Sequence, residues 1–328
     1  MNLSEAGELA LIEILRKKFR KKPRRLVLGI GDDSAVIKTG RDENVLLTTD
    51  MMVEGVHFDF RWTTPFQLGF KLVSVNVSDV YAMGGIPEFF LLNFAAPGKT
   101  SLAFFSRLFD GIKKAAEVYG LSLVGGDVSS ADKVVLSATV TGHAPRVLSR
   151  RGARAGDRIY VTGFLGDAAC GLEIMKRIKR PVEIEKDKKA GFGLEWTSAL
   201  PLIRRHLMPR AVKPDRFIDK ASAMIDVSDG LLIDLSRLCR ESRVGAVIHA
   251  ERIPVSGALR KAAGFLGVDA DEMALSGGED YELLFTARED TKIRAFCVGE
   301  IVTSGMRIID AGGRMFDAAA RGYRHFAV

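Results

Sequence analysis

The chain has 328 residues, of which 47% are hydrophobic and 27% are charged, a composition typical of ordinary globular proteins. This length favours two domains over one, and no apolar run approaches the ~20 residues that cross a bilayer. Much of the formal net charge of +7 comes from the basic residues between Arg16 and Arg25, and the N-terminus lacks the pattern of a signal peptide, so we expect a cytoplasmic protein.

The basic segment 16–25 is compatible with two interpretations. Some runs of this kind contact nucleic acid. Alternatively, the segment is the solvated end of a helix, where cations interact favourably with the helix dipole. No aromatic platform accompanies it, so we favour the second interpretation and expect neither a nucleic-acid nor a membrane partner. A partner of another kind stays open.

The three cysteines, Cys170, Cys239 and Cys297, lie far apart and form no Cys-x-x-Cys pair. Their spacing supports neither a zinc site nor a disulfide framework. Two of them sit in apolar contexts, where we expect buried thiols.

The first half of the chain alternates helical and extended patterns. Thr64-Pro65 is a good helix start, because Thr caps a helix and Pro suits its first position, and Ser101 starts a further helix. Hydrophobic periodicity predicts helices over 4–20, 65–83 and 102–119 and strands over 26–30, 45–49, 121–124 and 134–142.

A break at Ala144-Pro145 separates this half from the second. The pattern there predicts strands over 158–162, 222–226, 244–249, 281–287 and 297–302, a loop and helix over 163–178 and a helix over 231–241. The charged, irregular segment 179–195 is the best candidate for a mobile excursion. We expect two α/β or α+β lobes, residues 1–145 and 146–328, without the regular β-α-β-α rhythm of a doubly wound sheet.

Six short acidic motifs, each at the end of an apolar run, are the most informative feature of the chain. They read Gly-Ile-Gly-Asp-Asp (29–33), Thr-Thr-Asp (48–50), Asn-Val-Ser-Asp (76–79), Gly-Gly-Asp (125–127), Asp-Val-Ser-Asp-Gly (226–230) and Gly-Gly-Glu-Asp (277–280). Unpaired carboxylates repel one another and resist burial, so a folded protein gathers them around cations. Their hard oxygen ligands fit Mg²⁺ together with a polyphosphate.

Single aspartates of this kind are common in turns and helix caps, and the metal prediction therefore depends on the whole set. The candidate ligands are Asp32, Asp33, Thr48, Thr49, Asp50, Asp79, Asp127, Asp226 and Asp229. Asp229 is also a candidate N-cap for the helix from 231, and Ser228 could present its hydroxyl and amide to an anion.

Two segments resemble nucleotide-binding motifs but lack a glycine that each motif requires. The run Asn93–Thr100 resembles a P-loop but has Asn at the first Gly position, and we read it as a loop that leads into a helix. The segment from Gly29 begins a dinucleotide fingerprint and lacks its third Gly.

No nucleophile stands out, and the five histidines show no metal spacing. His57, eight residues past Thr49, is either a structural residue or part of the site.

The motifs in this order resemble the thiamine-monophosphate kinase family, of the superfamily that includes aminoimidazole ribonucleotide synthetase and selenophosphate synthetase. The likeness covers nearly the whole chain. It rests on Gly29-Ile-Gly-Asp-Asp-Ser, Thr49-Asp-Met-Met-Val-Glu-Gly-Val-His-Phe, Val75-Asn-Val-Ser-Asp-Val-Tyr-Ala-Met-Gly-Gly, Val124-Gly-Gly-Asp, Ser149-Arg-Arg-Gly-Ala, Ile225-Asp-Val-Ser-Asp-Gly, Leu275-Ser-Gly-Gly-Glu-Asp-Tyr-Glu-Leu and Gly322-Tyr-Arg-His-Phe. Single motifs occur across the superfamily, whereas the full set is specific to the kinase.

The resemblance implies direct transfer of the γ-phosphoryl group of ATP to thiamine monophosphate, with several Mg²⁺ ions, as the last step of thiamine diphosphate biosynthesis. This reaction agrees with a sequence that offers many hard oxygen ligands and no evident nucleophile. Phosphoryl transfer needs mainly positioning and charge neutralisation. Carried over by motif, the metal ligands would be Asp33, Thr48, Thr49, Asp50, Asp79, Asp127, Asp226 and Asp229. The ATP contacts would be Gly126, Asp127, Arg150 and Ser228, with Arg151 an alternative to Arg150, and the acceptor contacts would be His57, Glu279 and Tyr323.

The family fold has two α/β lobes, and its N-terminal lobes pair in a homodimer whose sheets join into a barrel. Two rival hypotheses remain beside the kinase. One is another ATP-dependent synthetase or ligase of the superfamily; selenophosphate synthetase would carry a reactive Cys near the N-terminus, and none precedes Cys170. The other is a non-catalytic nucleotide-binding scaffold, which has no reason to retain every acidic motif.

Overall fold

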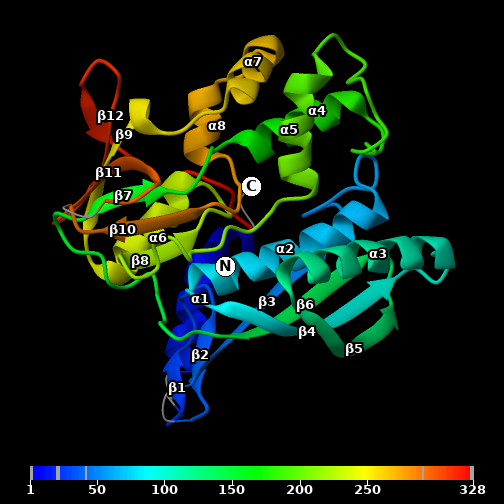
Figure 1. Ribbon diagram of the computed structural model, residues 1–328, viewed down its shortest axis with the longest axis horizontal. Helices are drawn as coiled ribbons and strands as arrows, with labels where there is room; N and C mark the ends of the chain where they lie inside the picture. The colour runs from blue at the N-terminus through cyan, green and yellow to red at the C-terminus, as the bar shows by residue number, and fades with distance from the viewer. Residues whose placement is uncertain (1–2, 20–22, 41–42, 290–291, 326–328) are drawn as a thin grey trace.

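Two mixed β-sheets, each covered by helices, form the framework of the protein, which is described here from a computed structural model (Figure 1). The structure describes residues 3–19, 23–40, 43–289 and 292–325. The first sheet lies between residues 26 and 143 and the second between residues 158 and 317. The chain therefore has a two-domain mixed α/β architecture.

The first sheet has the strand order β1-β2-β3-β6-β4-β5, in which β4 and β5 are parallel and every other pair is antiparallel. Its elements are α1 (Leu3–Lys18), β1 (Leu26–Leu28), β2 (Ala35–Lys38), β3 (Asn44–Val53), α2 (Pro65–Ala82), β4 (Ile86–Ala96), α3 (Leu102–Tyr119), β5 (Ser122–Ser130) and β6 (Val135–His143).

Local capping sets the ends of α2 and α3, as predicted. Thr64 and Gln67 form a reciprocal capping box at the start of α2, where Pro65 occupies the first helical position. The Ser101 side chain accepts a hydrogen bond from the Phe104 amide, and α3 ends at Gly120 with a left-handed backbone (φ 73°). Both predicted helices are confirmed.

Helices α2 and α3 cover one face of the first sheet, and the opposite face is open within the chain (Figure 1). The core lies under the helices and includes Leu72, Val80, Phe90 and Leu136. Side chains of the open face alternate with these along the strands, and every residue of the edge strand β5 is exposed.

The second sheet has the strand order β13-β12-β9-β11-β7-β10-β8, with only β9 and β12 parallel among its neighbouring pairs. Its strands are β7 (Arg158–Val161), β8 (Ala221–Asp226), β9 (Gly245–His249), β10 (Leu283–Ala287), β11 (Phe296–Val302), β12 (Met306–Ile309) and β13 (Met315–Asp317). The accompanying helices are α4 (Asp167–Ile178), α5 (Trp196–Leu207), α6 (Leu231–Ser242), η1 (Ala250–Arg252), α7 (Gly257–Leu266) and α8 (Ala270–Ser276).

Several elements were not predicted from the sequence. These are β2, β4, α5, η1, α7, α8, β12 and β13. The reading of Asn93–Thr100 as a loop is wrong for its first half, because residues 93–96 are the end of β4 and pair with β5 and β6. The remaining residues, 97–101, do form a loop before α3.

The predicted irregular segment 179–195 contains no helix or strand, but it is packed against the second domain. Its apolar side chains Val182, Ile184, Ala190 and Leu194 are buried beside α4, α5 and α7. Val182 also receives a hydrogen bond at its carbonyl oxygen from the Gln67 side chain of α2. Mobility of this segment stays a prediction.

Cys170 and Cys239 are buried free thiols, as expected from their apolar contexts, and Cys297 is partly buried. In α1, part of the basic run is already paired: Arg16 contacts Glu13 and reaches Glu241 of α6 at 2.9 Å. None of the helices in the described part of the chain is long and apolar enough to span a membrane.

We predict that the crossing of α2 and α3 is intolerant of a single methyl group. A Cβ added at Gly111 would overlap the backbone carbonyl of Phe66, so Gly111→Ala should lower the free energy of unfolding by about 1–3 kcal/mol. Gly264→Ala is the matched control, because a Cβ there meets nothing within 4 Å and Ala favours a helix by up to about 1 kcal/mol. Denaturant unfolding followed by circular dichroism measures both; a neutral or stabilising Gly111→Ala would contradict the close crossing.

Candidate functional site

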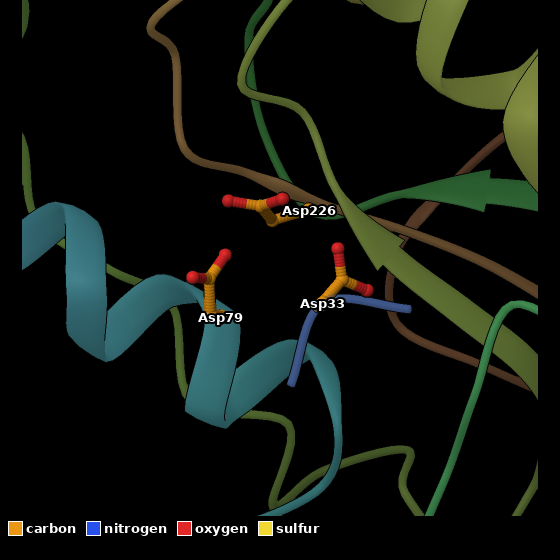
Figure 2. A group of neighbouring side chains, drawn as sticks. All are labelled: Asp33, Asp79 and Asp226. Atoms are coloured by element: carbon orange, nitrogen blue, oxygen red, sulfur yellow. The ribbon is translucent and has the colours of Figure 1, made fainter. Parts of the chain in front are cut away.

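Three carboxylates from distant parts of the sequence face a common space (Figure 2). Asp33 follows β1, Asp79 lies on α2, and Asp226 is the last residue of β8. One oxygen from each lies within 4.8 Å of the others. The first domain supplies two of these side chains and the second domain the third, so the cluster forms where the domains meet.

Each carboxylate is oriented by one polar neighbour. The Thr48 hydroxyl donates to Asp79 Oδ2 at 2.6 Å, and the Ser78 hydroxyl donates to Asp226 Oδ2 at 2.7 Å. Since Ser78 lies on α2, the second bond also joins α2 to β8. Asp33 is paired with a cation, Arg150.

Burial and repulsion by neighbouring carboxylates oppose ionisation of Asp79, Asp226 and Asp50. The pKa values of Asp79 and Asp226 are raised well above the ordinary range, first by burial and then by neighbouring carboxylates. Asp50 has its pKa raised to about 6 by burial, followed by the charges of Asp229 and Asp33. The carboxylates gathered here therefore outnumber the cations beside them.

The donor set fits a divalent cation such as Mg²⁺. Within the described residues, Asp33 Oδ2 and Arg150 Nε are buried polar atoms that have no hydrogen-bond partner. A carboxylate oxygen left without a donor among hard oxygen ligands is what a Mg²⁺ ion would satisfy. The residues present are thus compatible with the metal cluster expected from the sequence.

Arg150 is the arginine at the cluster, and Arg151 is exposed. The Arg150 Nη2 atom lies 2.6 Å from Asp33 Oδ1, and its backbone amide donates to Asp32 Oδ1 at 3.2 Å. Burial, followed by the charge of Asp33, raises the pKa of Asp32 to about 7. Arg150 therefore supplies the cluster's nearest cation.

The structure does not bring all the predicted ligands together. Three further predicted ligands lie near the clustered aspartates. Thr48 donates a hydrogen bond to Asp79, and the charges of Asp229 and Asp33 both act on Asp50. Thr49 follows Thr48 on β3 and is exposed on the opposite, open face of the sheet, where it bonds to β6. Asp127 is exposed on the edge strand β5.

Gly126 precedes Asp127 on β5 and has φ +150°, and a Cβ there would overlap the Leu92 carbonyl of β4. The backbone of β5 consequently lies unusually close to β4 at this point. Roles for Gly126 and the two exposed ligands, Thr49 and Asp127, stay predictions.

The loop 226–230, hereafter the acidic loop, differs from what its sequence suggested. The N-cap residue of α6 is Gly230, not Asp229. The amide of Ser228 is not available to a bound anion, because it donates to Asp234 Oδ2 at 3.1 Å. These two expectations were wrong, since a carboxylate from the first turn of α6 takes the capping position. The Ser228 hydroxyl as an ATP contact stays a prediction.

The three predicted acceptor-binding residues form a second group. The ring centroid of His57 lies 5.1 Å from that of His325, which is 5.0 Å from the ring of Tyr323. Burial lowers the pKa of the His57 imidazole, and the charge of the nearby Glu279 raises it by a smaller amount. Residues 57, 279 and 323 thus gather from both domains.

Glu279 is held in place by two residues that the sequence did not single out. Lys71 Nζ of α2 lies 2.6 Å from Glu279 Oε1, and His206 Nδ1 of α5 lies 2.9 Å from Oε2. Partial burial alone would raise the pKa of Glu279, but the charges of Lys71 and His206 outweigh this and depress it. The signal that the sequence offers is a lysine inside the otherwise apolar run 68–73, a position where an unpaired charge is rare.

Comparison with known proteins gives consistent matches along the chain. The AIR synthase related protein family matches twice, its N-terminal domain at residues 31–144 and its C-terminal domain at residues 154–303. The chain is 38% identical to the thiamine-monophosphate kinase of Aquifex aeolicus over 288 residues, 87% of each protein. It is 36% identical to that of Mycobacterium tuberculosis over 327 residues, 97% of this chain and 88% of the relative. A solved structure of AaThiL complexed with AMPPCP and TMP superposes with a TM-score of 0.86 at 34% identity and covers 99% of both chains.

We predict that stabilisation by Mg²⁺ increases with pH. The folded-state pKa values of Asp50, Asp79 and Asp226 are raised above their unfolded values, so the stability they contribute is full below the unfolded pKa and is lost as pH rises through the folded pKa. In chelator-treated protein, added Mg²⁺ should therefore raise the melting temperature at least about 2 °C more at about pH 8 than at about pH 5.

Thermal unfolding with and without Mg²⁺ at the two pH values measures this difference. Asp310→Asn is the control, because Asp310 lies in the turn after β12 and pairs with Arg314 away from the cluster. Equal shifts at both pH values would contradict metal binding by the raised-pKa carboxylates.

Proposed function

Because this chain belongs to the thiamine-monophosphate kinase family, we propose that it transfers the γ-phosphoryl group of ATP to the phosphate of thiamine monophosphate, yielding thiamine diphosphate and ADP. The family makes the chain a phosphotransferase. Support for both substrates comes from the related structure that holds AMPPCP, an ATP analogue, together with TMP.

The observation that carries the proposed mechanism is the meeting of Asp33, Asp79 and Asp226 with an unsatisfied carboxylate oxygen. Several Mg²⁺ ions held here, with Thr48, Asp50 and Asp229 beside the three aspartates, would neutralise the charge between two anionic phosphates. Thr49 and Asp127 stay in the proposed ligand set, although neither faces the cluster within this chain. Asp79 and Asp226 come from different domains, and the hydrogen bond from Ser78 to Asp226 joins the two halves of the site.

The nucleotide and the acceptor would approach the cluster from different sides. For ATP we propose contacts with Gly126, Asp127, Arg150 and the Ser228 hydroxyl, of which Arg150 already lies at the cluster. For the acceptor we propose His57, Glu279 and Tyr323, where the half-exposed tyrosine ring offers a surface for a heteroaromatic ring.

The proposed reaction is a direct in-line displacement. An oxygen of the acceptor phosphate forms a bond to the γ-phosphorus of ATP while the bond from that phosphorus to the bridging oxygen breaks and ADP leaves. This chemistry needs no protein nucleophile, and its main requirements are alignment and charge neutralisation. Arg150 and the metal ions that the aspartates of the cluster would hold are suited to alignment and to charge neutralisation.

We further propose that the chain forms a homodimer through its first domain, residues 1–145, while residues 146–328 form the second. Apolar side chains on the open face and edge of the first sheet support this, among them Met51, Phe89, Leu91 and Val128. Packing of two such sheets would form a barrel that covers the exposed Thr49 and Asp127. Sedimentation of the purified protein as a monomer would argue against it. The cytoplasmic location stays a prediction.

We predict that purified protein with ATP, Mg²⁺ and thiamine monophosphate produces thiamine diphosphate. Asp226→Asn and Asp50→Asn should each lower turnover at least about 100-fold without unfolding the protein, because several kcal/mol of charge stabilisation are lost. Asp310→Asn, outside the cluster, should keep near-normal turnover.

Chromatographic separation of the thiamine phosphates measures product, and circular dichroism checks the fold. Absence of thiamine diphosphate across a wide range of Mg²⁺ concentrations would rule out the kinase assignment. Near-normal turnover in both Asp50→Asn and Asp226→Asn would instead rule out the shared metal cluster.

A further inference from the structure

We propose that Asp234 and Arg237 are positioning residues that hold the acidic loop in the geometry in which Asp226 and Asp229 can bind metal. The inference rests on the proposed function only for its catalytic consequence, since the contacts themselves lie within the chain. Neither residue belongs to the motifs from which the site was predicted, and both lie on α6, behind the loop.

One oxygen of Asp234 accepts three consecutive backbone hydrogen bonds. The amides of Ser228, Asp229 and Gly230 donate to Oδ2 at 3.1, 3.0 and 3.0 Å. The Asp234 side chain is 0% exposed, so these amides are its principal source of hydrogen bonds. Three successive amides that point to one place form an anion-binding concavity at the start of a helix. In this protein that concavity is filled by the protein's own carboxylate.

The other Asp234 oxygen is paired with a cation that also reaches the metal ligand. Arg237 Nη1 lies 2.7 Å from Asp234 Oδ1 and 2.6 Å from Asp229 Oδ2. The guanidinium therefore bridges the two carboxylates and lowers the cost of burying them together. It also fixes one oxygen of Asp229, and with it the orientation of that carboxylate.

The remaining backbone groups of the loop are satisfied by the neighbouring segments. The Val227 amide donates to the Glu282 carbonyl, and the Ser228 carbonyl accepts from the Glu279 amide at 2.7 Å. The Asp229 carbonyl accepts from the Tyr323 amide at 2.9 Å. The loop that carries the metal ligands is thus bonded to both segments that carry the proposed acceptor contacts, and its shape is set before any ligand arrives.

This arrangement has a consequence for phosphate recognition. Because Asp234 occupies the amides of residues 228–230, a phosphate group cannot use them as donors. The loop can then act on phosphate only through its side chains and through a cation that Asp226 and Asp229 hold. Asp234 and Arg237 should therefore control metal affinity more than affinity for the acceptor.

The first test is hydrogen–deuterium exchange of the ligand-free protein. In the wild type, the amides of residues 228–230 should be protected, and in Asp234→Ala they should exchange at least about tenfold faster. Asp269→Ala is the matched control, because Asp269 also caps a helix with two backbone amides, at the exposed start of α8. It should leave the exchange of residues 228–230 unchanged. Unprotected amides in the wild type would overturn the proposal.

The second test separates positioning from general stability. Binding of Mn²⁺ alone, measured by electron paramagnetic resonance as a substitute for Mg²⁺, should weaken about 10- to 100-fold in Asp234→Ala, and kcat should fall by a similar factor. The KM for thiamine monophosphate should stay within about twofold, since Glu279 and Tyr323 bond to carbonyl groups of the loop that Asp234 does not contact. Wild-type Mn²⁺ affinity in this variant would overturn the proposal.

If Asp234→Ala does not fold, Arg237→Met and Arg237→Lys decide the question. Arg237→Met should weaken Mn²⁺ binding, and Arg237→Lys should restore part of it because a cation again reaches Asp229. Equal, wild-type affinities in both would contradict the proposal. Exchange and Mn²⁺ binding are measured without ATP or acceptor, so an inactive wild type with protected amides and a bound ion would sink the kinase assignment and leave this inference standing.

Discussion

The repulsion among carboxylates that both domains bring to one buried place is the constraint on which the rest of the structure depends. Asp33 and Asp79 from the first domain and Asp226 from the second lie close together, and ionisation of Asp79 and Asp226 is made more costly there. Burial makes that cost larger, because water no longer screens the charges. A fold that keeps such a cluster needs hydrogen bonds that hold each carboxylate in place and cations that compensate its charge.

Helix α2 supplies most of the support. It is buried along nearly its whole length, packs on the first sheet and contacts β8 and α5 of the second domain. Along one helix it places Lys71 against Glu279, Ser78 against Asp226 and Asp79 within the cluster. The domains are therefore joined by the same residues that shape the site, and a shift of α2 would disturb both the metal ligands and the proposed acceptor contacts.

Sequence alone predicts the parts of this structure that depend on local chemistry. The caps at Thr64 and Ser101 are read directly, because their partners lie three residues away. Strand β4 escaped prediction because apolar residues occupy both its faces, with Phe90 buried and Phe89 exposed, which hides the period of two. The direction of Thr49, opposite to Thr48, follows from strand alternation once β3 is known. The link between Asp234 and the acidic loop was not predicted, since the loop contributes backbone amides that carry no residue signature.

The most direct test of the shared cluster is the location of Mn²⁺ by anomalous diffraction from crystals grown with Mn²⁺, an ATP analogue and thiamine monophosphate. If the cluster brings the two phosphates together, manganese peaks should lie within ligand distance of Asp79 and Asp226 at once, between the nucleotide and the acceptor phosphate. Peaks confined to the carboxylates of one domain, or phosphates bound away from the cluster without an ion between them, would contradict it.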